Sequence, residues 1–370
     1  MTLLDRYFPP LNAKGAVKIH PAVPPAVGIP KVVHQTFYTR NLPPELRQSV
    51  AKIQDLNPGW AYRFYDDVDV ETFILGNYQP HVLDYFKRIN PRYGAARADL
   101  FRYLLMYKCG GVYLDIKSCP TRPFDDILRP QDQFLLSFWD NKAGDFEGWG
   151  LHDGVFGDAG EYQQWYIAAA PGHPFLKAVI ENVLTNIDRY NPSLHGIGRL
   201  GVLRLTGPIA YTSAIAPLLP FHDHRLADCR SELGFKYSVY EDMEHTATFR
   251  SHYTTLTEPV VAIDSAMKID AAIVATLKAI RRVMRFATGR ERPAQLRPPA
   301  AFSSPASKRS GPGRFGRLRP PDPAGAAGPG PDAGHAIDEP PQAPARRRGG
   351  TPGVHRDVAE DSVRLVERPS

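Results

Sequence analysis

The feature of this sequence that most constrains its fold is an alternation of short apolar runs with helical patterns. Buried-strand patterns occupy Lys31–Phe37, Trp60–Tyr65 and Val112–Ile116, and helical patterns occupy 46–56, 67–76, 79–89 and 95–108. This strand–helix–strand order predicts an α/β fold with a mainly parallel central sheet and flanking helices. Ligands of such sheets bind beyond the carboxyl ends of the strands. Thr36, Phe37, Asp115 and Lys117 are therefore candidate site positions.

Composition separates a body from a tail. Residues 291–370 hold 15 Pro and 10 Gly, and such a segment buries too little surface to offset its chain entropy, so we expect disorder there. Residues 265–370 carry 19 Lys and Arg against 10 Asp and Glu, whereas residues 1–264 carry 26 against 29. The net charge of +6 therefore comes from the C-terminal part, and we expect no nucleic-acid partner for the body.

Four parts are expected along the chain: an irregular lead-in (1–28), an α/β domain (29–264), a basic amphipathic helix (265–290) and the tail (291–370). Residues 263–286 place apolar side chains at helical spacing, namely Ile263, Ala266, Ile269, Ile273, Leu277, Ile280 and Met284. Such a helix either lies on an anionic membrane surface or docks on the body. We recognise neither a signal peptide nor a run of 18 apolar residues, so we expect a cytoplasmic protein, with peripheral membrane contact as the alternative.

The segment Ala95–Lys117 carries the chemistry. Asp99 and Arg102 are three residues apart on a helix and share one face, and the strand that follows sends Tyr113, Asp115 and Lys117 to one side. Carboxylates and a guanidinium together suit sugar hydroxyls, phosphate oxygens and a divalent ion. The alternatives are a surface Asp–Arg salt bridge and a strand-end Asp that serves only a turn. Spacing alone predicts an α/β enzyme or binding protein with a site for an anionic ligand.

This segment resembles the signature of the family-32 glycosyltransferases, which carry an Asp-x-Asp sugar-binding motif and include the yeast initiating α-1,6-mannosyltransferase. The motif block is also similar to that of the clostridial glucosylating toxins. Further segments resemble the family in the same order, namely Ile29–Phe37, Asn57–Tyr62, Trp165–Phe175 and Thr206–Pro208. The resemblance covers about residues 29–260.

The resemblance implies a GT-A fold and retaining transfer of a hexose from a nucleotide sugar (GDP-mannose, UDP-glucose or UDP-galactose) to a glycan or lipid-linked acceptor. Thr36 and Phe37 would border the base and ribose, with Phe37 as a stacking surface. Asp99 and Arg102 would hold the donor hexose and the diphosphate, beside Tyr113. Asp115 matches the first Asp of the motif, which in the family contacts the ribose and the metal.

The sequence departs from this pattern at Lys117, which replaces the second Asp of the motif, a metal ligand in the family. An ammonium group cannot coordinate a cation and repels one nearby. We expect that Mn²⁺ or Mg²⁺ is still held by Asp115, the diphosphate and a late residue such as His252. The first alternative is that Lys117 neutralises the leaving diphosphate without a metal, unless its side chain simply turns outward into solvent. The second is a catalytically weakened domain that binds a sugar nucleotide or glycan without transferring it.

Other polar residues are weaker candidates. His34 lies in an apolar strand and is expected to be a hydrogen-bonded core residue. Asp153 and Glu161 are either carboxylates near the acceptor or solvated loop residues. Gln163 and Gln164 are further residues that could face the acceptor.

Overall fold

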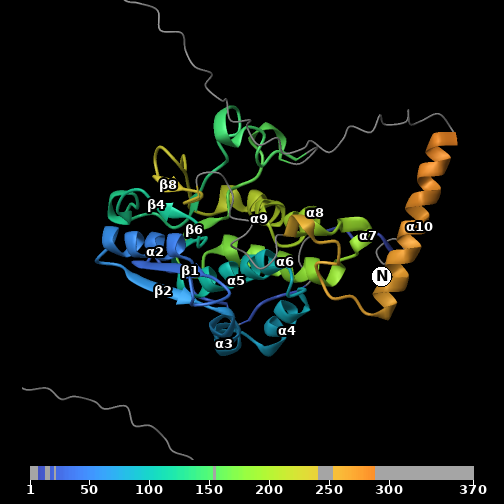
Figure 1. Ribbon diagram of the computed structural model, residues 1–370, viewed down its shortest axis with the longest axis horizontal. Coiled ribbons are helices and arrows are strands. Elements are labelled where there is room, and N and C mark those ends of the chain that lie inside the picture. The colour runs from blue at the N-terminus through green and yellow to red at the C-terminus, as the bar shows by residue number, and fades with distance from the viewer. Residues whose placement is uncertain (1–6, 13–16, 21, 153–155, 241–252, 288–370) are drawn as a thin grey trace, which may run out of the picture. The chain divides into compact units, whose positions relative to one another are not determined.

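The structure is a computed structural model that describes residues 7–12, 17–20, 22–152, 156–240 and 253–287 (Figure 1). The chain divides into two compact units, Met1–Arg297 and Pro298–Ser370, and all of the described residues belong to the first. The predicted tail, Asp153 and the candidate metal ligand His252 lie outside the described residues.

A four-stranded sheet with the order β2-β1-β3-β6 forms the centre of the unit. Its strands are β1 (Val32–Thr36), β2 (Ala61–Tyr65), β3 (Gly111–Leu114) and β6 (Tyr166–Ala169). β1 is parallel to both β2 and β3, whereas β3 and β6 are antiparallel. The predicted α/β class with a mainly parallel sheet is confirmed. β3 ends at Leu114, earlier than expected, so Asp115 lies just beyond the carboxyl end of a central strand.

Helices surround this sheet, and short 3-10 turns join several of them. The helices are α2 (Pro44–Leu56), α3 (Asp67–Asn77), α4 (Pro80–Arg88), α5 (Gly94–Cys109), α6 (Pro174–Arg189), α7 (Pro192–His195), α8 (Gly198–Leu205), α9 (Pro208–Ile215) and α10 (Ser265–Ala287). Two small ladders complete the fold, the antiparallel pair β4 (Cys119–Pro120) and β8 (Phe235–Lys236), and the parallel pair β5 (Leu135–Leu136) and β7 (Arg225–Leu226).

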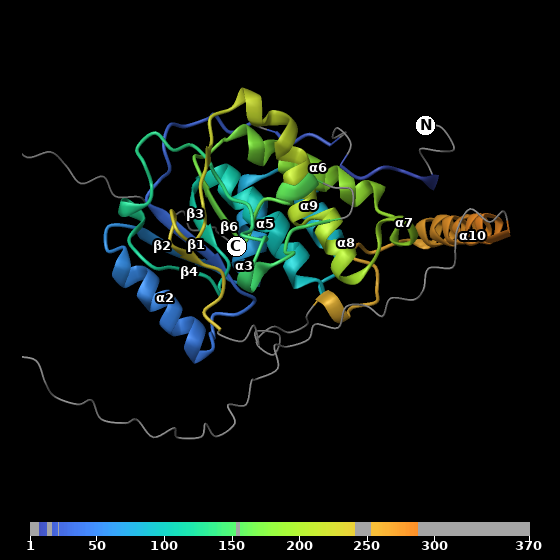
Figure 2. The same cartoon turned by 90° about the horizontal axis from the view of Figure 1, so that it is seen from above.

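The two faces of the sheet bury different hydrophobic clusters. Val112 and Leu114 of β3 pack in one cluster with Ile53 of α2. Tyr113 points to the opposite face and belongs to the main core, which contains α5, α6 and α9. Seen from above, α2 lies on one side of the strands and α5, α6 and α9 lie on the other (Figure 2). The sheet is therefore covered on both faces, as expected for this class.

Local signals explain where two of the helices begin or end. Asp66 caps α3: its side chain accepts hydrogen bonds from the backbone of Val68 and Asp69, in a capping box. α5 ends at Gly110, which has φ +63°, and Gly111 follows with φ +98°. A Cβ atom at Gly111 would lie 2.5 Å from the carbonyl oxygen of Val32. Glycine is thus required for β3 to approach β1 directly after the helix.

The central turns of α5 are buried on every side. Its residues from Leu100 to Tyr107 are all buried, with relative exposures of 4% or less. A helix enclosed on all faces has no solvent side for its polar residues. Asp99 and Arg102 are therefore interior residues, and the surface salt bridge considered from the sequence is excluded.

The described part of the N-terminal lead-in packs against the body. Ile19 is buried in the main core, and the Asn12 backbone donates a hydrogen bond of 2.8 Å to the Asn186 side chain on α6. One described stretch, Gly198–Phe221, is long and apolar enough by composition to cross a membrane, but half of its most apolar window is buried. Arg199 and Arg204 interrupt it, so it is not an unbroken run of 18 apolar residues. The stretch spans α8 and α9, and its burial is typical of core helices.

Candidate functional site

Arg102 is the centre of the candidate site. Its Nη1 atom lies 3.0 Å from Oδ1 of Asp115, and its Nη2 atom lies 3.2 Å from Oδ1 of Asp99. Nη1 also donates to the backbone oxygen of Gln164 at 2.8 Å, and the guanidinium carbon lies 4.9 Å from the ring centroid of Tyr113. Burial opposes the charge on Arg102, but Asp115, Tyr113 and Asp99 raise its pKa. The guanidinium is thus a fixed cation between two carboxylates.

Side chains from two later segments of the chain donate hydrogen bonds to the Asp99 carboxylate. Its Oδ2 accepts a hydrogen bond of 2.9 Å from the Thr206 hydroxyl, and its Oδ1 accepts one of 3.1 Å from Nε2 of Gln164. Thr206 lies in the turn between α8 and α9, one of the segments on which the family resemblance rests. Burial raises the pKa of Asp99, and Arg102 pulls it back down. The Asp99–Arg102 pair is therefore preorganised.

Asp115 is the most exposed of these three charged side chains. Its side chain is 24% exposed, compared with 4% for Asp99 and 5% for Arg102. Its backbone is fixed on both sides, because its N–H donates to Trp165 at 2.8 Å and its carbonyl accepts from Nε2 of Gln35 at 3.2 Å. A ligand that enters the site meets the Asp115 carboxylate, with Arg102 behind it.

Lys117 is buried, with 7% relative exposure, and does not turn outward into solvent. Its Nζ donates to the hydroxyl of Tyr237 at 2.8 Å and lies 4.0 Å from the centroid of that ring. Its backbone oxygen accepts from Val239 at 2.7 Å. Burial lowers the pKa of Lys117 to about 8, and the negative charge of Asp115 opposes that shift. The ammonium group is thus held at the site and stays mostly charged at neutral pH.

Aromatic rings fix Tyr237. Its ring contacts Trp139, Phe146, Trp149 and Trp165, with centroid separations between 5.3 and 6.1 Å. Rings at these separations pack closely and exclude water. Tyr237 therefore links Lys117 to an aromatic cluster that includes side chains of the segment 139–149.

Glu161 lies at the edge of this aromatic group and is 6% exposed. Its Oε2 lies 2.5 Å from Nε2 of His152, and its Oε1 accepts from Nε1 of Trp139 at 3.3 Å. The expectation of a solvated loop carboxylate is wrong for Glu161, because these partners hold it inside.

The predicted base-binding residues adjoin the same strand end. The Thr36 hydroxyl donates to the carbonyl of Tyr65 at 2.9 Å. Phe37 is 5% exposed and packs with Leu46 and Ile116, next to Asp115. Both residues therefore lie near the motif, but the ring faces of Phe37 are covered by side chains. Its stacking role stays a prediction.

The described residues do not fit a divalent cation at this position. Asp115 already binds Arg102, and Lys117 is a second buried cation two residues further along the chain. Among the described residues, no group of three or more His, Cys, Asp or Glu side chains is arranged to hold a metal ion. A hard cation such as Mg²⁺ needs several oxygen ligands. A metal held by Asp115 and His252 thus stays a prediction from the sequence.

Four site residues were missed or underrated by sequence reasoning: Gln164, Thr206, Tyr237 and Arg199. Gln164 bridges Asp99 and Arg102, although the sequence indicated only a residue facing an acceptor. Burial raises the pKa of Tyr237 and of Tyr253, and the charge of Arg199 opposes the rise in both. Arg199 is exposed at the start of α8 and adds a positive charge that acts on both tyrosines. Only Thr206 carried a signal, through its turn.

The fold and this site define an α/β protein with a buried carboxylate–guanidinium–carboxylate cluster at the carboxyl end of a central strand. Residues 43–135 match the family described as "Glycosyltransferase sugar-binding region containing DXD motif". The matched segment contains Asp99, Arg102, Asp115 and Lys117. The family resemblance is therefore confirmed.

Curated relatives agree with this family. The chain is 28% identical over 184 residues to inositol phosphoceramide mannosyltransferase 3 of Schizosaccharomyces pombe, covering 50% of this chain and 44% of the relative. It is 35% identical over 111 residues to mannosyl phosphorylinositol ceramide synthase SUR1 of Saccharomyces cerevisiae, covering 30% and 28%. It is 24% identical over 174 residues to the initiation-specific alpha-1,6-mannosyltransferase of S. pombe, covering 44% and 42%. The chain spans less than half the length of these relatives.

Among solved structures, the PaToxG glycosyltransferase is similar at 16% identity with a TM-score of 0.39, covering 69% of this chain and 89% of that one. The ligand-free glycosyltransferase domain of the YGT toxin is similar at 10% identity with a TM-score of 0.40, covering 67% and 89%.

Proposed function

We propose that this protein is a retaining hexosyltransferase of GT-A type that moves a hexose from a nucleotide sugar to a glycan or glycolipid. The observation that carries the proposal is the cluster of buried Asp99 and Arg102 with the partly exposed Asp115, inside the segment that matches the family. Carboxylates accept hydrogen bonds from sugar hydroxyls, and a fixed guanidinium suits phosphate oxygens. A sugar diphosphate presents both kinds of group.

Transfer of a hexose requires that the negative charge on the leaving diphosphate be stabilised. When the bond between the anomeric carbon and the diphosphate breaks, positive charge develops on the sugar and negative charge develops on the phosphate. Preorganised cations stabilise that negative charge without reorganisation at the moment of reaction. Arg102 and Lys117 supply such cations here, and Asp99 holds Arg102 in position. Retention is consistent with attack from the face of the departing phosphate.

The names of the relatives indicate which donor and which acceptor to test first. Several are named as mannosyltransferases, and two are named for products or acceptors that contain inositol phosphate and ceramide. We infer mannose as the first sugar to test, with glucose and galactose as the alternatives. GDP-mannose is then the donor, and a lipid with an inositol phosphate headgroup is the first acceptor.

The test is product formation by the full chain with GDP-mannose, UDP-glucose or UDP-galactose and this lipid. Mass spectrometry detects the added hexose, and NMR of the anomeric proton reports retention or inversion. Asp115→Asn should lower the rate at least about tenfold, whereas Asp84→Asn, an exposed carboxylate on α4, should not. A product of inverted configuration would contradict the retaining mechanism, and equal rates for both variants would contradict the assigned site.

We also propose that α10 makes peripheral contact with an anionic membrane. Within Ser265–Ala287, five cationic residues accompany one Asp. The helix docks on the body through Ala271 and Val274, which are buried, and the Lys278 ammonium donates to the carbonyl of Ser193 on α7 at 2.8 Å. The sequence left membrane contact and docking as alternatives, and this arrangement allows both.

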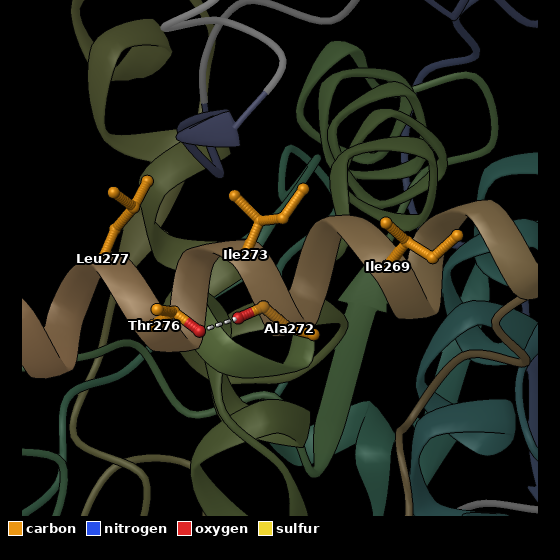
Figure 3. Close-up of a pocket in the computed structure, with 5 residues that line it drawn as sticks. All are labelled: Ile269, Ala272, Ile273, Thr276 and Leu277. Carbon is orange, nitrogen blue, oxygen red and sulfur yellow. Dashed lines mark hydrogen bonds between the residues drawn. The ribbon is translucent and has the colours of Figure 1, made fainter.

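The apolar stripe of α10 does not face the docked side. Ile269, Leu277, Ile280, Val283 and Met284 are between 42% and 67% exposed. Ile269, Ile273 and Leu277 point to the same side of the helix and line a groove of about 360 Å³ together with Ala272 and Thr276 (Figure 3). Exposed apolar residues beside cations are typical of helices that lie in the membrane interface.

Vesicle sedimentation tests this contact. The full chain should sediment with vesicles containing phosphatidylserine and much less with neutral phosphatidylcholine vesicles. Leu277→Glu combined with Ile280→Glu should abolish sedimentation, because two charges are added to the apolar stripe. Leu75→Glu, at a residue that is 60% exposed on α3, is the matched control. Equal sedimentation of all variants would exclude α10 as the contact.

Lys117 favours one second candidate function, a domain that binds a sugar nucleotide or glycan without transferring it. The replacement of the second Asp of the motif is the observation behind it. Tight binding of a nucleotide sugar without any product, even with the acceptor present, would support this alternative over the transferase.

A further inference from the structure

The charge at position 117 bears directly on whether this site needs a metal. With an Asp at that position, the side chains at 99, 102, 115 and 117 would carry a formal charge of about −2. With Lys117 they carry about zero, because the replacement adds two positive charges. Two charges are also what a divalent cation contributes. The chain therefore already contains the charge that a metal would bring to an Asp-x-Asp site.

The ammonium group is fixed where that charge is needed. Lys117 follows Asp115 by two residues, is 7% exposed, and bonds to Tyr237. Its neighbour Ser118 donates its hydroxyl to the carbonyl of Tyr237 at 2.6 Å, and Val239 donates to the carbonyl of Lys117 at 2.7 Å. These two hydrogen bonds and the aromatic packing of Tyr237 thus fix the position of Lys117.

Charge repulsion disfavours a divalent cation in the same place. Arg102 already lies 3.0 Å from the Asp115 carboxylate, and Lys117 is a buried cation two residues after Asp115. A metal ion at Asp115 would compete with Arg102 and be repelled by Lys117. A diphosphate, in contrast, gains from both cations.

We propose that Lys117, positioned by Tyr237, takes the place of the divalent cation, so that this protein binds the diphosphate of its donor and releases it without a metal. The proposal rests on the function proposed above and specifies how the leaving group is neutralised. The ligand class is a nucleoside diphosphate or a sugar ester of one. Lys117 and Arg102 contact its phosphate oxygens, and Tyr237 acts as a positioning residue.

The test is isothermal titration calorimetry of the full chain with GDP and with UDP, in EDTA and in Mn²⁺. The wild-type protein should bind one nucleotide with dissociation constants that agree within about twofold between EDTA and Mn²⁺. Lys117→Met should weaken binding at least tenfold in both, whereas Lys117→Arg should keep metal-independent binding. Lys117→Asp, which restores the Asp-x-Asp motif, should bind weakly in EDTA and recover in Mn²⁺.

Matched controls separate a local effect from loss of folding. Lys236→Met removes an exposed lysine from the neighbouring strand β8 and should bind as the wild type does. Tyr237→Phe keeps the ring and should weaken binding less than Lys117→Met. If Lys117→Met does not fold, comparison of Lys117→Arg with Lys117→Asp still decides the question.

The possible failures are distinguishable. Wild-type binding that occurs in Mn²⁺ but is lost in EDTA would overturn the inference and leave the proposed transferase standing. The absence of nucleotide binding under both conditions would overturn both proposals.

Discussion

Arg102→Met is the most informative single perturbation of the site. The methionine fills much of the volume but removes the only guanidinium that lies within 4 Å of the Asp99 and Asp115 carboxylates among the described residues. Asp99 would then be a buried anion, 4% exposed, with only Thr206 and Gln164 as partners. Removing one partner of a buried ion pair costs about 3–5 kcal/mol. We expect a loss of that size in the free energy of unfolding at pH 7.

The loss should depend on pH. Without Arg102, burial raises the pKa of Asp99 further above its value in the unfolded chain. A carboxyl with a raised pKa destabilises the folded state above its unfolded pKa and stops doing so once it is protonated. The difference between variant and wild type should therefore shrink as the pH falls from 7 toward 4. Urea unfolding followed by circular dichroism at several pH values measures it.

A double variant supplies the control. Asp99→Asn combined with Arg102→Met removes both charges and should recover most of the lost stability, because no unpaired charge stays buried. The reasoning is refuted if Arg102→Met costs less than about 1 kcal/mol. It is also refuted if the double variant is less stable than Arg102→Met alone.

Three further predictions concern the sheet and the site entrance. Burial lowers the pKa of His34 to about 4. As the pH falls below about 6.5, the unfolded chain therefore binds this proton before the folded protein does, and at pH 5 the wild type should lose about 2 kcal/mol in the free energy of unfolding that His34→Gln does not lose. In thermal unfolding, Gly111→Ala should lower the stability of the fold by about 2–3 kcal/mol, because Gly111 has a positive φ and its added Cβ would contact Val32. Gly59→Ala is the control and should be nearly neutral, because no atom lies within 4 Å of its added Cβ. Arg199→Gln should weaken GDP or UDP binding a few-fold at low salt and have little effect at 0.5 M NaCl, because the exposed charge is screened.

Much of the fold could be predicted because local signals agree with it. The Asp66 cap, the paired glycines after α5 and the apolar strand runs each have a short-range physical cause. His34 was predicted to be a satisfied core residue, and its two ring nitrogens lie 3.2 Å from the Tyr65 hydroxyl and 3.1 Å from the Gly110 carbonyl. A histidine buried in an apolar strand has to hydrogen-bond to nearby polar groups, so its role could be predicted from its position.

The site was predictable only in part, because its partners come from distant segments. The spacing of Asp99 and Arg102 is visible locally, but their burial depends on how α5 is enclosed by later helices. Gln164 reaches Asp99 across 65 residues, and Tyr237 reaches Lys117 across 120 residues. No periodic pattern encodes such contacts. The sequence therefore predicted the charged residues but not the groups that hold them.

The central claim is that the cluster around Arg102 binds and activates a nucleotide sugar. The most direct test follows release of nucleoside diphosphate when the full chain is incubated with GDP-mannose, UDP-glucose and UDP-galactose separately. We predict release from one donor, with Asp115→Asn at least about tenfold slower and Asp84→Asn unchanged. Release from no donor, together with no measurable binding of any, would contradict the account.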